Sequence, residues 1–135
     1  MRFATGRVMS TSQICERSFE FARRIVPLCD RMSERSFSAR HIAGQLVRSA
    51  TSICANAHEA QEGQTKPDFI AKMSVSRKEA REANFWLRFA AATGMLSTSE
   101  IAWELQESLE LLRMIRHAIR TARSRPDRGN SDWST

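Results

Sequence analysis

Apolar residues recur along most of the chain at the spacing of an amphipathic helix. In residues 12–32 they stand three or four positions apart, as at Phe21, Ile25 and Leu28, and a second apolar row runs beside the first. Such spacing gathers apolar side chains on one face of a helix. We therefore predict a deeply packed helix over 12–32, bent at Pro27, where the ring removes one backbone hydrogen bond.

Two further segments show the same period and carry their own end signals. Residues 38–62 place alanine at every second position of the apolar row, which lets a neighbouring helix approach closely, and Gly63 follows as a terminating residue. Residues 65–93 open on a capping threonine, with proline in the first turn, and Gly94 follows them. Each segment is predicted to be a helix.

Residues 97–124 carry the most regular apolar row of the chain. Ser97 and Glu100 form a capping-box pair, which predicts that a helix begins there. The four rows together predict a core that includes Leu46, Ile53, Leu87, Leu105 and Leu112.

The four predicted helices are joined by connections of roughly two to six residues, which force consecutive helices to be antiparallel neighbours. We predict an all-α fold, an antiparallel up-down-up-down left-handed four-helix bundle over residues 12–124. Residues 1–11 are expected to be a flexible N-terminus. Residues 125–135 lack any period and are expected to be a disordered tail.

The composition supports this fold class. Five glycines, three prolines and no tyrosine among 135 residues argue against a many-stranded sheet. The three cysteines, Cys15, Cys29 and Cys54, are widely spaced and lie on or beside apolar rows, which favours buried free thiols in a reducing compartment. No apolar run is long enough for a membrane span or a signal peptide, so we expect a cytoplasmic protein.

Carboxylates on the two middle segments raise the question of a di-metal site. Glu59 and Glu62 lie three apart on one predicted helix, and Glu79 and Glu82 do so on the next. Ferritin-like centres, however, need Glu-x-x-His repeats, and the chain has none. A phosphate-binding loop and a nucleophile motif are also absent from the sequence. We predict no metal, no cofactor, no catalytic residue and no small-molecule substrate.

Polar residues on the middle helices have a different interpretation. A row of small or polar side chains runs beside the apolar row of 38–62, and either the next helix or another subunit is expected to cover it. It consists of Gln45, Ser49, Ser52, Asn56 and Glu59. The spacing also allows a connected structural network. Its members would be Arg48, Asn56, Glu59, Glu79 and Glu82.

The basic end of the chain suggests a polyanion partner. The formal net charge is +6, and four arginines spaced three, four and three apart share one face of the last helix, with Arg125 and Arg128 beyond it. They are Arg113, Arg116, Arg120 and Arg123. Arginine suits phosphate contacts. The alternative is that glutamates early and arginines late in this helix merely complement its dipole. Both interpretations stay open at this point.

Three stretches resemble a known family. They are RSFEFARRIVPLC (Arg17–Cys29), QLVRSATSICANAHEA (Gln45–Ala60) and FIAKMSVSRKEAREANFWLR (Phe69–Arg88). Together they resemble the four-helix-bundle proteins encoded in intervening sequences of 23S rRNA genes, and the resemblance extends over most of the predicted bundle.

The resemblance implies a ring-like homopentamer with no known enzymatic activity. Related accessory proteins of diversity-generating retroelements bind a reverse transcriptase and nucleic acid through a basic surface. The family's characteristic residues correspond here to Gln45, Arg48, Ser49, Ser52, Asn56, Glu59, Lys78, Glu79, Glu82 and Trp86. On this ground Gln45, Ser52, Lys78 and Trp86 are also assigned to the structural polar network. Two positions depart from the family pattern: Arg77 stands where an apolar residue is common, and His58 where an acid is common.

The residues and the resemblance together predict a non-enzymatic homo-oligomer, a pentamer by the resemblance. It is expected to bind RNA, DNA or a ribonucleoprotein through the arginine face. The alternative is a protein–protein scaffold without affinity for nucleic acid.

Overall fold

A computed structural model of the chain describes residues 10–63 and 65–126. All regular secondary structure in these two ranges is α-helical, which confirms the predicted all-α, four-helix fold. The helices are α1 (Thr11–Ser33), α2 (Phe37–Gln61), α3 (Lys66–Ala92) and α4 (Ala102–Ser124). The predicted flexible N-terminus and disordered tail fall almost entirely on residues 1–9 and 127–135, outside the described residues.

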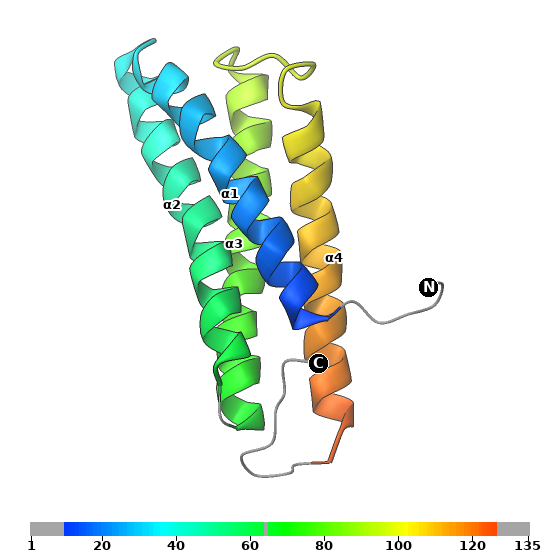
Figure 1. The fold of residues 1–135 in the computed structure, drawn as a ribbon. Helices are drawn as coiled ribbons and strands as arrows, with labels where there is room; N and C mark the ends of the chain where they lie inside the picture. The colour runs from blue at the N-terminus through cyan, green and yellow to red at the C-terminus, as the bar shows by residue number, and fades with distance from the viewer. Residues whose placement is uncertain (1–9, 64, 127–135) are drawn as a thin grey trace.

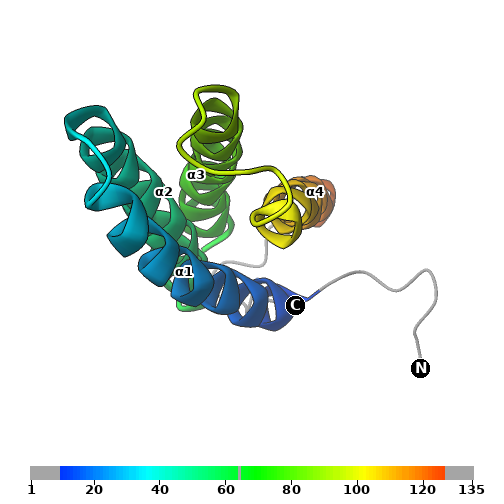
Figure 2. The ribbon, with the colours of Figure 1, turned by 90° about the horizontal axis from the view of Figure 1, so that it is seen from above.

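Successive helices run in opposite directions along the molecule (Figure 1). Each helix packs closely against two others: α1 and α3 both lie beside α2 and α4, and within the described residues no Cα atom of α1 comes within 8 Å of one in α3. The view from above shows α1 crossing the others obliquely, with its C-terminal half along α2 and its first turns approaching α4 (Figure 2). The left-handed twist of the bundle and the bend at Pro27 stay predictions.

The ends of α3 follow the predicted signals. The Thr65 hydroxyl accepts a hydrogen bond from the backbone N–H of Asp68 at 3.2 Å, which caps the first turn. At the other end Gly94 has a φ of +80°, and the Met95 N–H donates to the Ala90 carbonyl at 2.9 Å. This is a Schellman ending, in which glycine adopts the left-handed conformation without steric cost.

The start of α4 differs from the prediction. Ser97 and Glu100 do form their reciprocal pair, with the Ser97 N–H donating to the Glu100 carboxylate at 2.8 Å. That pair caps only a single turn, and the regular helix begins five residues later, at Ala102. A capping box therefore formed where the sequence predicted it, but the helix did not continue from it.

The core lies between the four helices, and the predicted core is right for α2 and α3. Leu46, Ile53 and Leu87 are fully buried. On α4 the prediction was wrong: Leu105 and Leu112 are only half-buried, and Leu111 is fully buried instead. The first half of α4 is thus rotated by about one residue, roughly 100°, relative to the face that its leucines predicted.

The second apolar row of α1 is also less buried than predicted. Phe19 and Val26 are 60% and 41% exposed, although their neighbours in the row pack inward. With Ala22, Arg23 and α2 side chains Thr51, Cys54 and Ala55 they line an apolar hollow of about 310 Å³. We call this the α1–α2 apolar hollow.

The cysteines are free thiols of low reactivity. Cys15 and Cys29 are buried as predicted, and burial raises their pKa values to about 11 and about 12. Cys54 is only half-buried, although desolvation raises its pKa too. Because the thiolate is the nucleophile, we expect iodoacetamide at about pH 8 to label the folded protein slowly, and Cys54 first. Mass spectrometry of timed samples would show the order; labelling of Cys29 first would contradict it.

Candidate nucleic-acid interface

The four predicted arginines of α4 all lie exposed on its outer face. Arg113 is engaged by Glu110 of the same helix, and this pairing holds the pKa of Glu110 below its usual range. Arg116, Arg120 and Arg123 form no ion pair with any described carboxylate. Three of the four charges are therefore uncompensated by the carboxylates of residues 10–63 and 65–126.

A fifth arginine joins them from α3. The antiparallel register of α3 and α4 is set in part by Asn84, whose amide donates to the Ser108 hydroxyl at 2.9 Å in the buried interface. This register places Arg77 opposite the basic half of α4. There it lines a hollow of about 250 Å³ with Arg116, Ile119, Arg120 and Arg123. We call this the four-arginine hollow; no carboxylate lines it.

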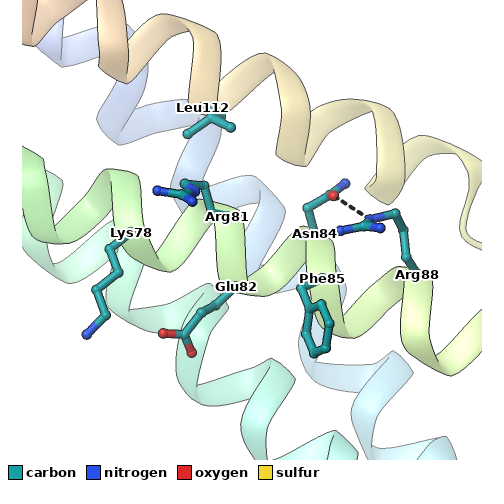
Figure 3. Close-up of a pocket in the computed structure, with 7 residues that line it drawn as sticks. All are labelled: Lys78, Arg81, Glu82, Asn84, Phe85, Arg88 and Leu112. Atoms are coloured by element: carbon teal, nitrogen blue, oxygen red, sulfur yellow. Dashed lines mark hydrogen bonds between the residues drawn. The ribbon is translucent and has the colours of Figure 1, made fainter.

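A second hollow, of about 460 Å³, lies further along α3 (Figure 3). Its lining residues are Lys78, Arg81, Glu82, Asn84, Phe85, Arg88 and Leu112. Arg81 and Asn84 point toward α4, with Leu112 opposite, whereas Lys78, Glu82 and Phe85 point to the other side of α3. The Arg88 guanidinium donates to the Asn84 side-chain oxygen at 2.9 Å. The cationic surface thus continues along α3 beyond the four-arginine hollow.

Part of the predicted polar network is assembled. The Arg48 guanidinium on α2 donates to Glu79 at 3.1 Å and to Glu82 at 2.8 Å, both on α3, and also to the Ser49 hydroxyl at 3.2 Å. Glu79 is only 5% exposed, so Arg48 neutralises a nearly buried carboxylate. This cluster fastens α2 to α3, and the small polar row is covered here by α3 of the same chain.

The structure places the other predicted members apart from Arg48. Asn56 bonds to Ser52 within α2, at 2.9 Å to its carbonyl oxygen. Glu59 is largely exposed, and the one described cation that its side chain meets is Lys72, at 3.7 Å. Gln45 is half-buried, Lys78 is exposed beside the second hollow, and the Trp86 indole N–H is buried without a hydrogen-bond partner. Arg125 lies just beyond α4, where its carbonyl accepts a hydrogen bond from Lys66 at 2.7 Å.

Sequence reasoning missed a second set of charges, between α1 and α4. Glu104 and Glu107 belong to the early glutamates of α4, for which the sequence offered only complementation of the helix dipole as one alternative, but they are only 6% and 8% exposed. Arg17 binds Glu107 through two hydrogen bonds of 2.7 and 2.9 Å, and Arg24 lies 3.5 Å from Glu104. Arg24 also lies 4.0 Å above the centre of the Trp103 ring. The sequence pattern that could have indicated this pairing is the spacing of the two glutamates, three residues apart, and of Arg17 and Arg24, seven residues apart.

Residues 10–63 and 65–126 contain no group of three or more His, Cys, Asp or Glu side chains that could hold a metal ion. Three of the four carboxylates considered for a di-metal site are instead engaged by cations: Arg48 engages Glu79 and Glu82, and Lys72 lies 3.7 Å from Glu59. Of the four described helices, none is both long and apolar enough to cross a membrane.

Comparison of the sequence with protein-family models shows which family the chain belongs to. The family model described as 23S rRNA-intervening sequence protein matches residues 10–117. The chain belongs to this family. The resemblance stated from the sequence is thereby confirmed. Comparison with curated proteins gave no match.

A solved structure of the same kind supports the fold. It is the crystal structure of a protein with unknown function from the S23 ribosomal protein family, from Bacteroides thetaiotaomicron VPI-5482. The two sequences are 31% identical, the TM-score is 0.76, and the match covers 83% of this chain and 99% of that chain. The match to the 23S rRNA-intervening sequence protein family ends at residue 117, so it includes Arg77 and Arg116 but not Arg120 or Arg123.

Proposed function

We propose that this chain is a non-enzymatic, homo-oligomeric helical bundle that binds nucleic acid, free or within a ribonucleoprotein, through the basic surface of α3 and α4. The observation that carries the proposal is the four-arginine hollow. Arginines from two helices converge there, and no carboxylate lines it. Guanidinium groups so placed suit phosphate oxygens.

The pattern of ion pairing favours this interpretation over helix-dipole complementation. Arginines that serve structure in this chain have carboxylate partners, as Arg17, Arg24 and Arg48 do. In the four-arginine hollow, no described acid offsets the mutual repulsion of the cations. Like charges held together without a partner cost stability, and an anionic ligand would relieve that cost.

The test is RNA binding measured by fluorescence anisotropy over a range of salt concentrations. Wild-type affinity should fall steeply with salt, because each phosphate contact releases a counterion. Changing Arg116, Arg120 and Arg123 together to Glu should abolish binding and leave the helical circular dichroism signal intact. The matched control changes Arg31, Arg35 and Arg40 to Glu, an equal change of charge at exposed positions outside the hollow.

Two results would contradict the proposal. The first is a wild type without affinity at physiological salt and a triple variant that loses stability instead, which would favour helix-dipole complementation and the protein–protein scaffold. The second is an equal loss of binding in the control, which would mean that only net charge matters.

We propose that self-association uses the α1–α2 apolar hollow, since Phe19 and Val26 leave large apolar side chains in solvent there. The family resemblance supplies the number five. Light scattering at micromolar concentration should give a mass several times 15.4 kDa, and Val26→Glu should lower it, because a charge would be buried in the contact. The control is Val75→Glu, at an equally exposed valine on α3. A monomeric wild type would refute self-association.

Repetition of the basic surface in such an oligomer would strengthen binding. Each copy contributes one four-arginine hollow, and a polyanion that spans two of them binds the second at a high effective concentration. Disruption of the oligomer should therefore weaken binding to long RNA more than binding to short RNA.

A further inference from the structure

We infer that the basic surface of α3 and α4 selects single-stranded over double-stranded nucleic acid, with phosphates along the arginines and a base stacked on Phe85. The inference rests on the proposed function and adds the class of ligand. It follows from three features of the described residues: the straight course of the cations, the exposed ring beside them, and the neutralisation of the nearest acid.

The cations follow the axis of α3. Arg77, Arg81 and Arg88 are spaced four and seven residues apart, which places them on one side of the helix. From Arg77 to Arg88 the row extends about 16 Å at 1.5 Å per residue, and the α4 arginines continue it. The phosphates of a duplex wind around the duplex axis, so only a few of them can contact a straight row of arginines. A flexible single strand can follow such a row throughout.

Phe85 stands beside this row, one turn from Arg81 and three residues from Arg88. Its side chain projects from α3 on the side away from α4, where the residue is 45% exposed (Figure 3). Trp86 meets the Phe85 ring edge-on with centroids 4.9 Å apart, and Phe89 lies beside it at 6.0 Å. These neighbours restrict the ring, so it forms a prepared surface on which a base can stack.

Glu82, the carboxylate that lines this second hollow, repels a phosphate only weakly. Glu82 is already engaged by Arg48 at 2.8 Å, so its charge is offset from the α2 side. On the α4 side, Arg88 is oriented by its hydrogen bond to Asn84. Arg81, Arg88 and Phe85 line the same hollow from opposite edges of α3, so a nucleotide seated in it can place its phosphate on the cations and its base on the ring. Bases in a duplex are paired and stacked, and they are not available to that ring.

The experiment compares a labelled single-stranded RNA of mixed sequence with a blunt RNA duplex of equal length. Wild type should bind the single strand more tightly. Phe85→Ala should weaken single-strand binding roughly 5- to 150-fold, the range for loss of one stacked base, and leave duplex binding unchanged. Its salt slope should stay the same, because no charge is lost. Phe85→Leu, which keeps apolar volume but removes the ring, should behave like Phe85→Ala.

Two further variants separate stacking from charge. Phe37→Ala removes an aromatic residue that is 81% exposed on α2 and should change neither affinity. Arg77→Gln should make the single-strand salt slope shallower by about 0.7, the value for one phosphate contact. Circular dichroism confirms that each variant remains folded.

The outcomes distinguish the two proposals. If wild type binds neither RNA at low salt, the proposed function itself fails. If it binds both RNAs equally and the Phe85 variants bind the single strand like wild type, the selectivity is overturned while the proposed function stands. An equal loss on both RNAs in the Phe85 variants would also overturn the selectivity.

Discussion

Leu111→Ala is expected to lower the free energy of unfolding by about 2–5 kcal/mol, whereas Leu112→Ala should lower it by only about 1 kcal/mol. Leu111 is fully buried between the helices, so its truncation leaves a cavity that the core cannot fill. Leu112 is half-buried at the edge of the second hollow, where water replaces the lost side chain. Urea unfolding measures the two changes in the free energy of unfolding. The variants are compared at equal protein concentration, because self-association shifts apparent stability.

The adjacent leucines form a direct test of how α4 is rotated. Both variants remove the same atoms from neighbouring positions of one helix, so helix propensity cancels in the comparison. Equal costs, or a larger cost for Leu112, would mean that α4 presents to the core the face that its leucine row predicted. The burial of Glu104 and Glu107 would then be wrong as well, since the same rotation places them inside.

Arg17→Met is expected to lower the free energy of unfolding by about 1–3 kcal/mol and to loosen α1 from α4. The Glu107 side chain is 10% exposed, and both its oxygens accept hydrogen bonds from Arg17. Without that partner a desolvated carboxylate remains. The double variant Arg17→Met with Glu107→Leu should recover most of the loss, because apolar replacement of both partners removes the unpaired charge.

Hydrogen exchange locates this effect. Amides in the first half of α1 should exchange faster in Arg17→Met, while those of α2 and α3 stay protected. The control is Arg113→Met, whose partner Glu110 lies on the same helix, and no measurable change in the exchange of α1 amides is expected there. Failure of the double variant to recover stability would show that Arg17 contributes through its packing and not through its charge.

The fold was predictable because its signals are local. The period of each apolar row depends only on neighbouring residues, and so does the Schellman ending at Gly94. Every helix therefore appeared in the sequence with nearly its final bounds, except the first turn of α4. There the capping pair Ser97 and Glu100 is a local signal as well, but it capped an isolated turn.

What could not be predicted depends on partners far away in the chain. The buried side of α4 is decided by Arg17 and Arg24, which engage Glu104 and Glu107 from another helix. In the first half of α4, either the leucine row or the row containing Glu104 and Glu107 could face the core. The position of Arg17 and Arg24 decides that the row with the glutamates is buried. Arg77 is a similar case, since its place in the four-arginine hollow depends on the register between α3 and α4.

The arrangement in which α1 meets α4 but not α3 has a consequence for how the chain folds. Contacts of α2 with α1 and α3, and of α3 with α4, join consecutive helices and close short loops. The contact between Arg17 and Glu107 spans 90 positions. Bringing such distant residues together costs more chain entropy than forming a local hairpin, and it delays folding. The α1–α4 edge should therefore form last during folding and open first during unfolding, with the two buried glutamates as the first core groups to regain water.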